Sequence, residues 1–588
     1  MGDNSTLSTP PMGPPALQLI EEMTRNAGAV QQSVLAQILA ENAQTEYLKR
    51  FSIDGAIDQG MFKSNVPMIT YPDIRPLIRK MADGDRSPIL CAQPISIFVM
   101  SSGTSGEPKF IPSTKEVLDR TLLLCSLIQP IMNLHVKELD KGKGLNFMFM
   151  RSDTETQGGI TARTALTDLY KSDRFKNRPK DIYTTPNEAL YCTDTFQSMY
   201  TQMLCGLYER EQVNRIETTF GSGIVRVIRF LELNWKQLTH DIRTGSLYSK
   251  VTDMSIREYM TRFMQPNPEL ADHVGKECGK ENWEGIITRI WPNTKYLGAI
   301  VTGTMAQYIP ILDRYSKGLP IVSGIYASSE SYLGINLNPM CKQSEVSYTF
   351  MPFLAYFEFL PYEPNSPELA HSELVDLVDV KMGNEYEVVI TTIAGLYRYR
   401  LGDIVRVVGY YNSAPQFRFV MRKNVLLSID GEKTTEIELQ AAGEMASELL
   451  RQFDTSVADY TSFVDTTSVP EHYVIYLELL VQANSSVKSR PSAEVLDQCC
   501  LVMEESLNLL YRMFRVVDKT IGPLEIRVVE SGTFEELMND AISRGVSISQ
   551  YKVPRCANSN SMLDLLDSRI VSKHVSPSPP HWSTKHSI

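Results

Sequence analysis

The sequence predicts an α/β fold with a large N-terminal domain and a smaller C-terminal domain. Helical and strand patterns alternate along the chain, and no internal repeat interrupts them. At 588 residues the chain is long enough to form more than one hydrophobic core. The pattern changes at residues 428–433, where a strand ends, a glycine turn follows and a helix begins. This change marks the expected domain boundary.

Four regions follow from this division. Residues 1–16, which include two Pro-Pro pairs, are expected to be disordered, and residues 17–430 to form the N-terminal domain. Residues 431–570 are expected to form a C-terminal cap domain, and residues 571–588 a disordered tail.

The first elements of the large domain surround a polar loop. An amphipathic helical pattern runs from Leu17 to about Leu48 with breaks. Residues 95–100 read as a buried strand and residues 110–112 as a short apolar strand. Residues 113–116 (Ser-Thr-Lys-Glu) read as a capping box that opens a helix through Leu127. The residues between the two strands therefore form a strand-to-strand loop.

Two further strands of the large domain end in polar clusters. Residues 319–322 lead into the segment Tyr326–Glu330, and residues 387–392 end at a turn containing Gly395. Residues 362–373 are rich in charge and are expected to form a surface loop. Sites in α/β folds gather at strand ends, because loops vary there while the sheet stays rigid.

The smaller domain also alternates helix and strand. The expected elements are a helix at 436–451, a strand at 472–481, a helix at 493–513, a strand at 524–529 and a helix capped by Thr533.

Composition excludes several classes of protein. The net charge is −11, and no Lys/Arg run is interleaved with aromatic residues, so nucleic acid is not an expected partner. The nine cysteines form no C-x-x-C pair and no Cys/His array with metal-ligand spacing. No membrane-spanning run and no signal peptide is visible, so we expect a cytoplasmic protein with reduced thiols and no membrane partner.

The loop Ser101–Lys109 has the composition of a phosphate-binding loop. Its hydroxyls, glycines and single lysine suit a polyphosphate, because glycine lets backbone amides approach phosphate oxygens. A Walker loop would run from its lysine directly into a helix, whereas Lys109 enters a strand that contains Pro112. A solvated Ser/Gly linker remains the alternative interpretation.

Two other clusters are ambiguous when each is taken alone. Glu330, with the hydroxyls around it, suits magnesium or phosphate, but its segment could instead be a Ser N-cap followed by a helix. Asp403 follows Arg398 and Arg400 beside a glycine turn and could accept both ribose hydroxyls. The alternative for this second cluster is a salt-bridge ladder at a strand edge.

Cations stand near the domain boundary. Arg422, Lys423 and Lys433 could contact a nucleotide or could equally lie on the solvated surface.

The order of these clusters resembles adenylate-forming enzymes, and the chain most closely resembles the plant acyl acid amido synthetases of the Gretchen Hagen 3 family. The resemblance covers roughly residues 17–569. Its motifs are Ser101–Ser105, Tyr326–Glu330, Ser347–Pro352, Tyr356–Leu360, Gly395–Asp403 and Gln550–Cys556. It implies a luciferase-like N-terminal domain with a mobile cap. It also implies that ATP and a carboxylic acid give an acyl-adenylate and pyrophosphate, after which an amino acid displaces AMP.

The resemblance also implies roles for individual residues. The phosphate contacts would be Ser101, Ser102, Thr104 and Ser105. Glu330 would hold Mg²⁺ or phosphate, and Asp403 would bind ribose. The adenine would be bordered by Ile325, Tyr326 and Tyr348. Arg422 and Lys433 would contact the nucleotide, and Lys552 would be carried into the site by the cap. Lys552, Lys433 and Glu330 are thus the expected catalytic residues.

The acid is expected to bind beside the helix that follows the phosphate loop. By resemblance the acyl pocket contains Cys125, Ile128 and Tyr332, and a benzoate-using branch of the family carries arginine at the position of Ile128. An apolar residue there favours a larger acid such as indole-3-acetic acid. Thr167 and Asp168 are candidates for the amino-acid side by family position, with a solvated turn as the alternative.

Other outcomes stay open for the reaction. The same chemistry on jasmonate or a substituted benzoate is one alternative. The phosphate loop is one residue shorter than the family pattern, so a catalytically weak acid-binding protein is another. We expect the protein to act as a monomer.

Overall fold

The computed structural model describes residues 14–52, 58–101, 109–150, 152–179, 181–363, 374–423, 426–453, 455–481, 491–543, 553–557 and 559–582. It divides into two compact units. Unit 1 contains the chain up to Ser101 and Lys109–Lys423, and unit 2 begins at Asn424. The boundary was expected at residue 430. It falls earlier because Leu426 and Leu427 hydrogen-bond to Thr434, which makes the glycine turn between them part of unit 2.

The elements of unit 1 are mixed. Its helices are α1 (Pro14–Arg25), α2 (Ala27–Asn42), α3 (Glu46–Lys49), α4 (Gln59–Asn65), α5 (Tyr71–Ala82), α6 (Lys115–His135), α7 (Ala165–Lys171), α8 (Asp173–Lys176), α9 (Asn187–Tyr191), α10 (Thr195–Tyr208), α11 (Gly221–Thr244), α12 (Met254–Phe263), α13 (Pro268–Cys278), α14 (Ile286–Ile290) and α15 (Ile309–Ser316). Short 3₁₀ helices span Leu139–Lys141, Gly303–Tyr308 and Gln343–Glu345.

Among the described residues, the strands of unit 1 form three sheets. They are β1 (Ile97–Ser101), β2 (Lys109–Ser113), β3 (Lys143–Asn146), β4 (Thr154–Glu155), β5 (Thr161–Arg163), β6 (Val213–Phe220), β7 (Tyr296–Ile300), β8 (Ile321–Val322), β9 (Ile325–Ala327), β10 (Tyr332–Ile335), β11 (Tyr348–Phe350), β12 (Tyr356–Pro361), β13 (Val375–Asp376), β14 (Glu385–Thr391), β15 (Tyr399–Tyr411) and β16 (Ala414–Arg422). The largest sheet is antiparallel and has the order β13-β12-β14-β15-β16-β11-β10-β9. The others are β2-β1-β5-β4 and the parallel sheet β3-β6-β7-β8.

The loop with phosphate-binding composition joins two strands, as predicted. Strands β1 and β2 pair antiparallel, with Ser101 opposite Lys109. Lys109 is the first residue of a strand, so the rejection of a Walker loop is confirmed. Residues 102–108 of the loop lie outside the described residues.

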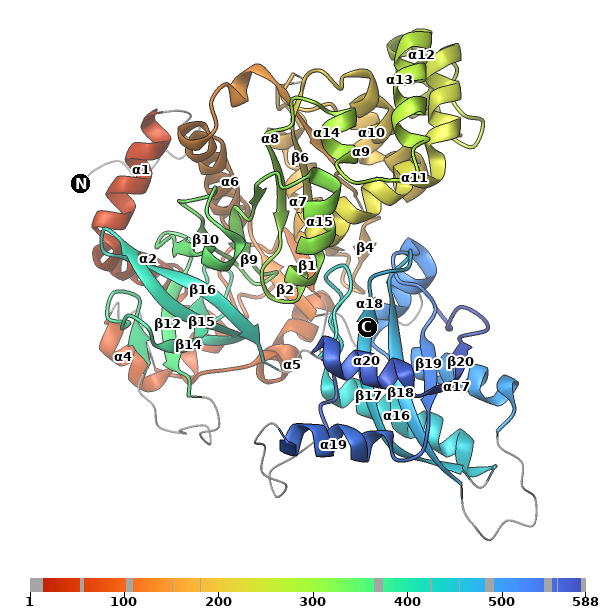
Figure 1. Cartoon of the computed structure of the whole chain (residues 1–588). Helices are drawn as coiled ribbons and strands as arrows, with labels where there is room; N and C mark the ends of the chain where they lie inside the picture. Colours follow the sequence, from red (N-terminus) through yellow and green to blue (C-terminus); the bar gives the residue numbers. More distant parts are fainter. Residues whose placement is uncertain are drawn as a thin grey trace. The chain divides into compact units, whose positions relative to one another are not determined.

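The hydrophobic cores of unit 1 stabilise these elements by packing helices against sheets. One core packs α1, α2 and α5 against β1, β2 and the large sheet, and a second packs α10, α11 and α13 against the parallel sheet. Helices α11 and α13 lie side by side (Figure 1). The large sheet and the β1–β2 hairpin share the first core.

Helix α6 forms where predicted, but the capping box at its start does not. Thr114 is the N-cap residue and makes no side-chain cap hydrogen bond. Glu116, the expected partner, instead accepts from Arg120, Gln37 and Gln93. By length and composition α6 would also be able to cross a membrane. Its buried residues Leu124, Leu127, Ile131 and Met132 belong to hydrophobic clusters of unit 1.

Unit 2, coloured cyan to blue in Figure 1, has one mixed sheet in the order β17-β18-β19-β20. Its strands are β17 (Thr455–Asp465), β18 (His472–Val481), β19 (Glu525–Val529) and β20 (Ile570–Val575). Its helices are α16 (Glu436–Arg451), α17 (Ala493–Ser506), α18 (Leu509–Met513), a π-helical turn at Phe514–Asp518, α19 (Thr533–Ser543) and α20 (Asn560–Ser568). The predicted helix at 436–451 and strand at 472–481 are confirmed. The helix expected at 493–513 is broken, because the Asn508 side chain caps α18 by accepting from Tyr511 N.

The predictions for the N-terminal and C-terminal ends of the chain have different outcomes. Helix α1 begins at Pro14, before the predicted start at Leu17, and residues 1–13 lie outside the described residues. The prediction that residues 571–588 form a disordered tail is wrong for residues 571–575, which belong to β20 and pair with β19. They are ordered because β19 would otherwise present its backbone hydrogen-bonding groups unpaired.

Candidate active site

Glu330 lies in the turn of a β hairpin. Strands β9 and β10 pair antiparallel, and the turn between them is closed by hydrogen bonds between Ser328 and Ser331. A strand follows the turn, so the alternative of a serine N-cap opening a helix is wrong. The Glu330 carboxylate is buried and accepts a hydrogen bond from the Tyr399 hydroxyl at 3.3 Å.

Asp403 lies on β15 directly opposite Arg422 on β16. Its Oδ1 is 3.2 Å from Arg422 Nη1, and its Oδ2 accepts from the Tyr326 hydroxyl at 2.8 Å. Gly402, just before it, has φ of +83°, a conformation that L side chains rarely adopt. Its carbonyl accepts from Lys423 N, so the glycine fixes how the two strands meet beside the carboxylate.

The arginines near Asp403 have other partners. Arg398 makes a bidentate pair with the buried Glu358, with both distances 3.0 Å, and Arg400 pairs with Glu387 at 2.7 Å. Both arginines therefore form salt bridges, as the alternative expected, but β15 lies inside the sheet and not at its edge. Lys423 also pairs with Glu387, at 2.9 Å, rather than lying free on the surface.

Lys109 adds a second cation to the cluster formed by Glu330, Asp403 and Arg422. Its ammonium lies 5.5 Å from the centre of the Tyr71 ring. Burial lowers the pKa of Lys109, and Glu330 opposes this change while Arg422 adds to it. Burial would also lower the pKa of Arg422, but Asp403 and Glu330 outweigh it and raise that pKa. The cluster thus combines two carboxylates and two cations, which is a suitable environment for a charged ligand.

Aromatic rings adjoin the carboxylates. The Tyr326 ring lies 5.4 Å from that of Tyr348, 5.7 Å from Phe350 and 6.0 Å from Phe419, measured between centroids. Ile325 precedes Tyr326 on β9 and packs against the same core. Tyr348 is covered by protein, and its burial raises its pKa to about 12. An aromatic and aliphatic surface of this kind suits a planar base.

The predicted acyl-pocket residues also come together. Helix α6 contacts β10, and Cys125 lies close enough to Tyr332 and to Tyr170 of α7 to influence the pKa of both phenols. Burial raises the pKa of Cys125 to about 12, so its thiol is not a nucleophile. Ile128 faces the backbone at Gly324, where an added Cβ would lie 4.0 Å from Ile128 Cγ2.

Thr167 and Asp168 stand in the first turn of α7. Thr167 is buried, and its hydroxyl accepts from Thr164, the N-cap of that helix. Asp168 lies 3.4 Å from Arg163, and its pKa is raised mainly by burial. Neither residue lies on a solvated turn, so that alternative is wrong.

The structure does not test the positions of the remaining predicted residues relative to this cluster. Ser102, Thr104, Ser105 and Lys552 lie outside the described residues, as does the side chain of Ser101. Lys433 belongs to unit 2, where its carbonyl accepts from Asn508 Nδ2 at 3.1 Å. Tyr399 and Tyr71 were not predicted as site residues, and Lys109 was predicted only as the lysine of the phosphate-binding loop. The sequence contains a pattern from which Tyr399 could have been predicted. Tyr399 stands four residues before Asp403, just as Tyr326 stands four residues before Glu330.

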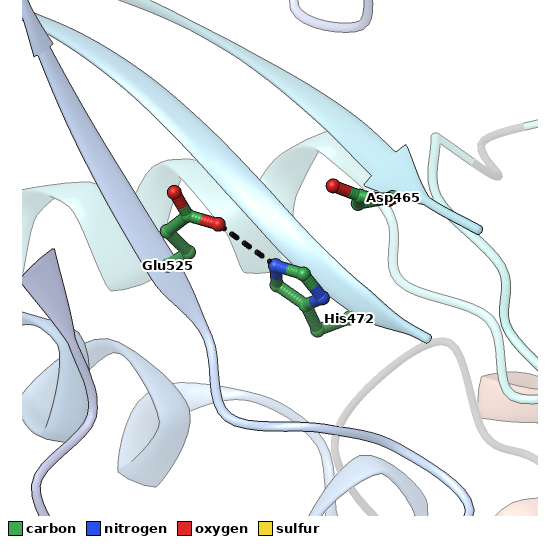
Figure 2. Close-up of side chains that lie close together, drawn as sticks. All are labelled: Asp465, His472 and Glu525. Atoms are coloured by element: carbon green, nitrogen blue, oxygen red, sulfur yellow. Dashed lines mark hydrogen bonds and ion pairs between the residues drawn. The ribbon is translucent and has the colours of Figure 1, made fainter. Parts of the chain in front are cut away.

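Unit 2 contains a second cluster of metal-ligand residue types, Asp465, His472 and Glu525 (Figure 2). His472 Nε2 lies 2.9 Å from Glu525 Oε2. Arg527 donates to Glu525 Oε1 at 2.9 Å and to Asp465 Oδ2 at 3.2 Å. Burial raises the pKa of Glu525, but hydrogen bonds from His472 and Arg527 outweigh it and lower that pKa to about 2. The guanidinium already supplies the positive charge, so this cluster is an ion-pair network.

Two carboxylates beside two cations and aromatic rings agree with the nucleotide site expected of an adenylate-forming ligase. The overall fold agrees with a solved structure described as "GH3.15 acyl acid amido synthetase". It is 45% identical, its TM-score is 0.69, and the match covers 98% of this chain and 100% of that one.

The chain belongs to the GH3 family. Its N-terminal, central and C-terminal domain models match residues 16–321, 348–422 and 438–561. A "Probable indole-3-acetic acid-amido synthetase GH3.1" of Arabidopsis thaliana is 58% identical over 99% of both chains. The "Indole-3-acetic acid-amido synthetase GH3.8" of Oryza sativa subsp. indica is 56% identical over 96% of this chain and 94% of its own length. The resemblance seen in the sequence is thereby confirmed.

Proposed function

We propose that this protein uses ATP to adenylate indole-3-acetic acid or a similar auxin and transfers the acyl group to an amino acid, releasing AMP and pyrophosphate. The observation that carries the proposal is the cluster of the buried Glu330 and Asp403 with Arg422 and Lys109, which joins residues of separate segments in unit 1. The identity of the acid is supported by the relatives named as indole-3-acetic acid-amido synthetases.

In this proposal, each residue of the cluster interacts with a different part of the nucleotide. Asp403 accepts the ribose hydroxyls, and Arg422 and Lys109 offset the phosphate charge. Glu330 holds Mg²⁺, which fits because this ion binds through one or two carboxylates together with substrate phosphates. When bound, Mg²⁺ neutralises charge that develops on the phosphates during attack.

Basic residues of unit 2 complete the reaction in this proposal. Lys433 contacts the nucleotide, and Lys552 enters the site when the C-terminal unit closes. Both residues place positive charge near the α-phosphate, where AMP becomes the leaving group.

The acid lies between α6 and β10 in this proposal. Cys125, Ile128 and Tyr332 form its apolar surroundings, which desolvate an arylalkanoic acid at little cost. Thr167 and Asp168 contact the amino acid, whose ammonium is attracted by the Asp168 carboxylate. We also propose that the protein acts as a monomer, which light scattering of the purified chain tests.

The test is acid-dependent exchange of pyrophosphate into ATP, followed by mass-spectrometric detection of the amide. The assay uses purified protein, ATP, Mg²⁺, a panel of acids and the twenty amino acids. Exchange with indole-3-acetic acid and formation of its amide support the proposal. Exchange only with jasmonate or a substituted benzoate would change the substrate, and tight acid binding without any ATP requirement would replace the enzyme by a binding protein.

A further inference from the structure

Two hydrogen bonds cross between the two carboxylate segments of the candidate site. Tyr326 and Glu330 lie four residues apart on one segment, and Tyr399 and Asp403 lie four residues apart on another. The Tyr326 hydroxyl donates to Asp403 Oδ2 at 2.8 Å, and the Tyr399 hydroxyl donates to Glu330 Oε1 at 3.3 Å. Each tyrosine therefore bonds to the carboxylate of the other segment.

The crossed bonds join strands that are not neighbours in the sheet. Tyr326 is on β9 and Tyr399 on β15, and the strands β16, β11 and β10 lie between them. In a flat sheet four strand spacings would separate the two strands by about 19 Å. The sheet must therefore curl until its β9 edge approaches β15. Aromatic contacts of Tyr326 with Phe350 and Phe419 fill the inside of this curve.

The Tyr326 and Tyr399 hydroxyls are suited to hold the two carboxylates in place because they are neutral hydrogen-bond donors. All four side chains are buried. A phenol is protonated at neutral pH, so both hydroxyls are available as donors. A phenol fixes one oxygen of a carboxylate without cancelling its charge, whereas a lysine or arginine would compete with Mg²⁺.

We infer that Tyr326 and Tyr399 are positioning residues that lock the ribose carboxylate and the magnesium carboxylate at a fixed separation. The inference rests on the proposed function, because it takes Asp403 as the ribose acceptor and Glu330 as the magnesium ligand. With the separation fixed, the ribose and the phosphates of one ATP molecule meet both carboxylates together. Loss of either hydroxyl leaves the charges in place but loosens one carboxylate.

The test compares Tyr326→Phe, Tyr399→Phe and the double variant with wild type. Binding of ATP and of 2′-deoxy-ATP is measured by calorimetry, and the Mg²⁺ dependence of pyrophosphate exchange is measured with indole-3-acetic acid. Tyr326→Phe should reduce discrimination against 2′-deoxy-ATP about tenfold, and Tyr399→Phe should raise the Mg²⁺ concentration at half-maximal exchange about tenfold. In the double variant, the shift of each readout should differ from the sum of the shifts in the two single variants.

The matched control is Tyr356→Phe on β12 of the same sheet. Tyr356 is equally buried, and its hydroxyl donates to Asp376 Oδ1 at 2.8 Å. This variant should lose stability but keep both the nucleotide discrimination and the Mg²⁺ dependence of wild type.

Three results separate this inference from the proposed function. If wild type exchanges pyrophosphate but both site variants behave as wild type, the inference is wrong and the function stands. If Tyr356→Phe shifts both readouts as strongly as the site variants do, the hydroxyls act only through stability and the inference is also wrong. If wild type shows no exchange with any acid, the proposed function fails, and the calorimetric discrimination still decides the role of Tyr326.

Discussion

At the scale of single residues, the Asp403–Arg422 pair governs the electrostatics of the site. Asp403 is almost fully buried, and a buried carboxylate is stable only when an opposite charge and hydrogen bonds compensate it. Arg422 supplies the charge from the adjacent strand, and Tyr326 supplies a hydrogen bond. The arrangement fixes a hydrogen-bond acceptor for a ligand with hydroxyl groups.

Asp403→Asn should weaken ATP binding strongly. The amide keeps the size of the side chain and can still accept from Tyr326, but it removes the charge that pairs with Arg422 and accepts ribose hydroxyls. Hydrogen bonds to a charged group contribute about 1.5–3 kcal/mol, so the Kd for MgATP should rise roughly ten- to hundredfold. Calorimetry with MgATP measures it. Glu385→Gln on β14, whose partner is the exposed Arg406, serves as control and should bind ATP normally. An unchanged Kd for Asp403→Asn would contradict the assignment.

Ile128→Arg should shift the preferred acid. Ile128 lies on α6 and faces Gly324, so a guanidinium at this position would lie in an apolar environment. Burying that charge is costly unless a carboxylate pairs with it. The ratio of kcat/KM for substituted benzoates over indole-3-acetic acid should rise at least about tenfold. Leu134→Arg is the matched control, because Leu134 is on the same helix but 66% exposed. If the ratio does not change, Ile128 does not line the acyl pocket.

The candidate site could be predicted in part from sequence. Glu330 and Asp403 were predicted because each belongs to a local motif, and Arg422 was predicted as a cation near the domain boundary whose role the family resemblance implies. Tyr399 and the electrostatic coupling of Lys109 to Glu330 and Arg422 were missed because both depend on partners far away in the chain, which a local pattern does not contain. A curled sheet brings those partners together, and curvature leaves no simple trace in a sequence.

At the scale of elements, prediction succeeded where local chemistry decides the ends. Helix α16 starts at its predicted residue because Thr435 and Glu438 form a complete capping box. The same signal failed at α6 because Glu116 bonds to Arg120 and Gln37 instead, a tertiary choice that outweighs the local one. Strand β20 was missed because its residues alternate in burial and stand next to a Ser/Pro-rich end.

Removal of β20 should destabilise unit 2. The strand pairs along its length with β19, and His574 on it is buried. A chain ending at Ser568 would leave β19 as an open edge and should melt several degrees lower or aggregate. Differential scanning calorimetry and light scattering measure both effects. A chain ending at Trp582 keeps β20 and is the control. A normal melting temperature without β20 would show that the strand adds no stability.

At the scale of the whole molecule, each unit has its own hydrophobic core and its own buried charges. Unit 2 contains an unusual buried ionisable group, Glu432, which is fully buried and precedes Lys433 in the chain. Its carboxyl bonds to Tyr473, to Asn508 at 2.9 Å and to Thr434 at 2.8 Å. Burial outweighs these bonds and raises the pKa of Glu432 from 4.5 to about 7.

The stability of unit 2 should therefore fall as the pH rises from about 5 to about 7. In this range the native state keeps a proton on Glu432 that the unfolded state has already lost, so each rise in pH favours unfolding. The full loss is on the order of 3 kcal/mol, and stability should become level once Glu432 is ionised in both states.

Glu432→Gln tests this origin of the pH dependence. The amide keeps an acceptor for Asn508 and Thr434 and has no proton to lose, so the melting temperature of unit 2 should change little between pH 5 and pH 7. At pH 8 the variant should be as stable as wild type or more stable, because wild type then contains a buried charge. Calorimetric melting at pH 5, 6, 7 and 8 measures the curve. Glu436→Gln, an exposed position on α16, should leave the slope of wild type intact. An unchanged slope in Glu432→Gln would place the titrating group elsewhere in the molecule.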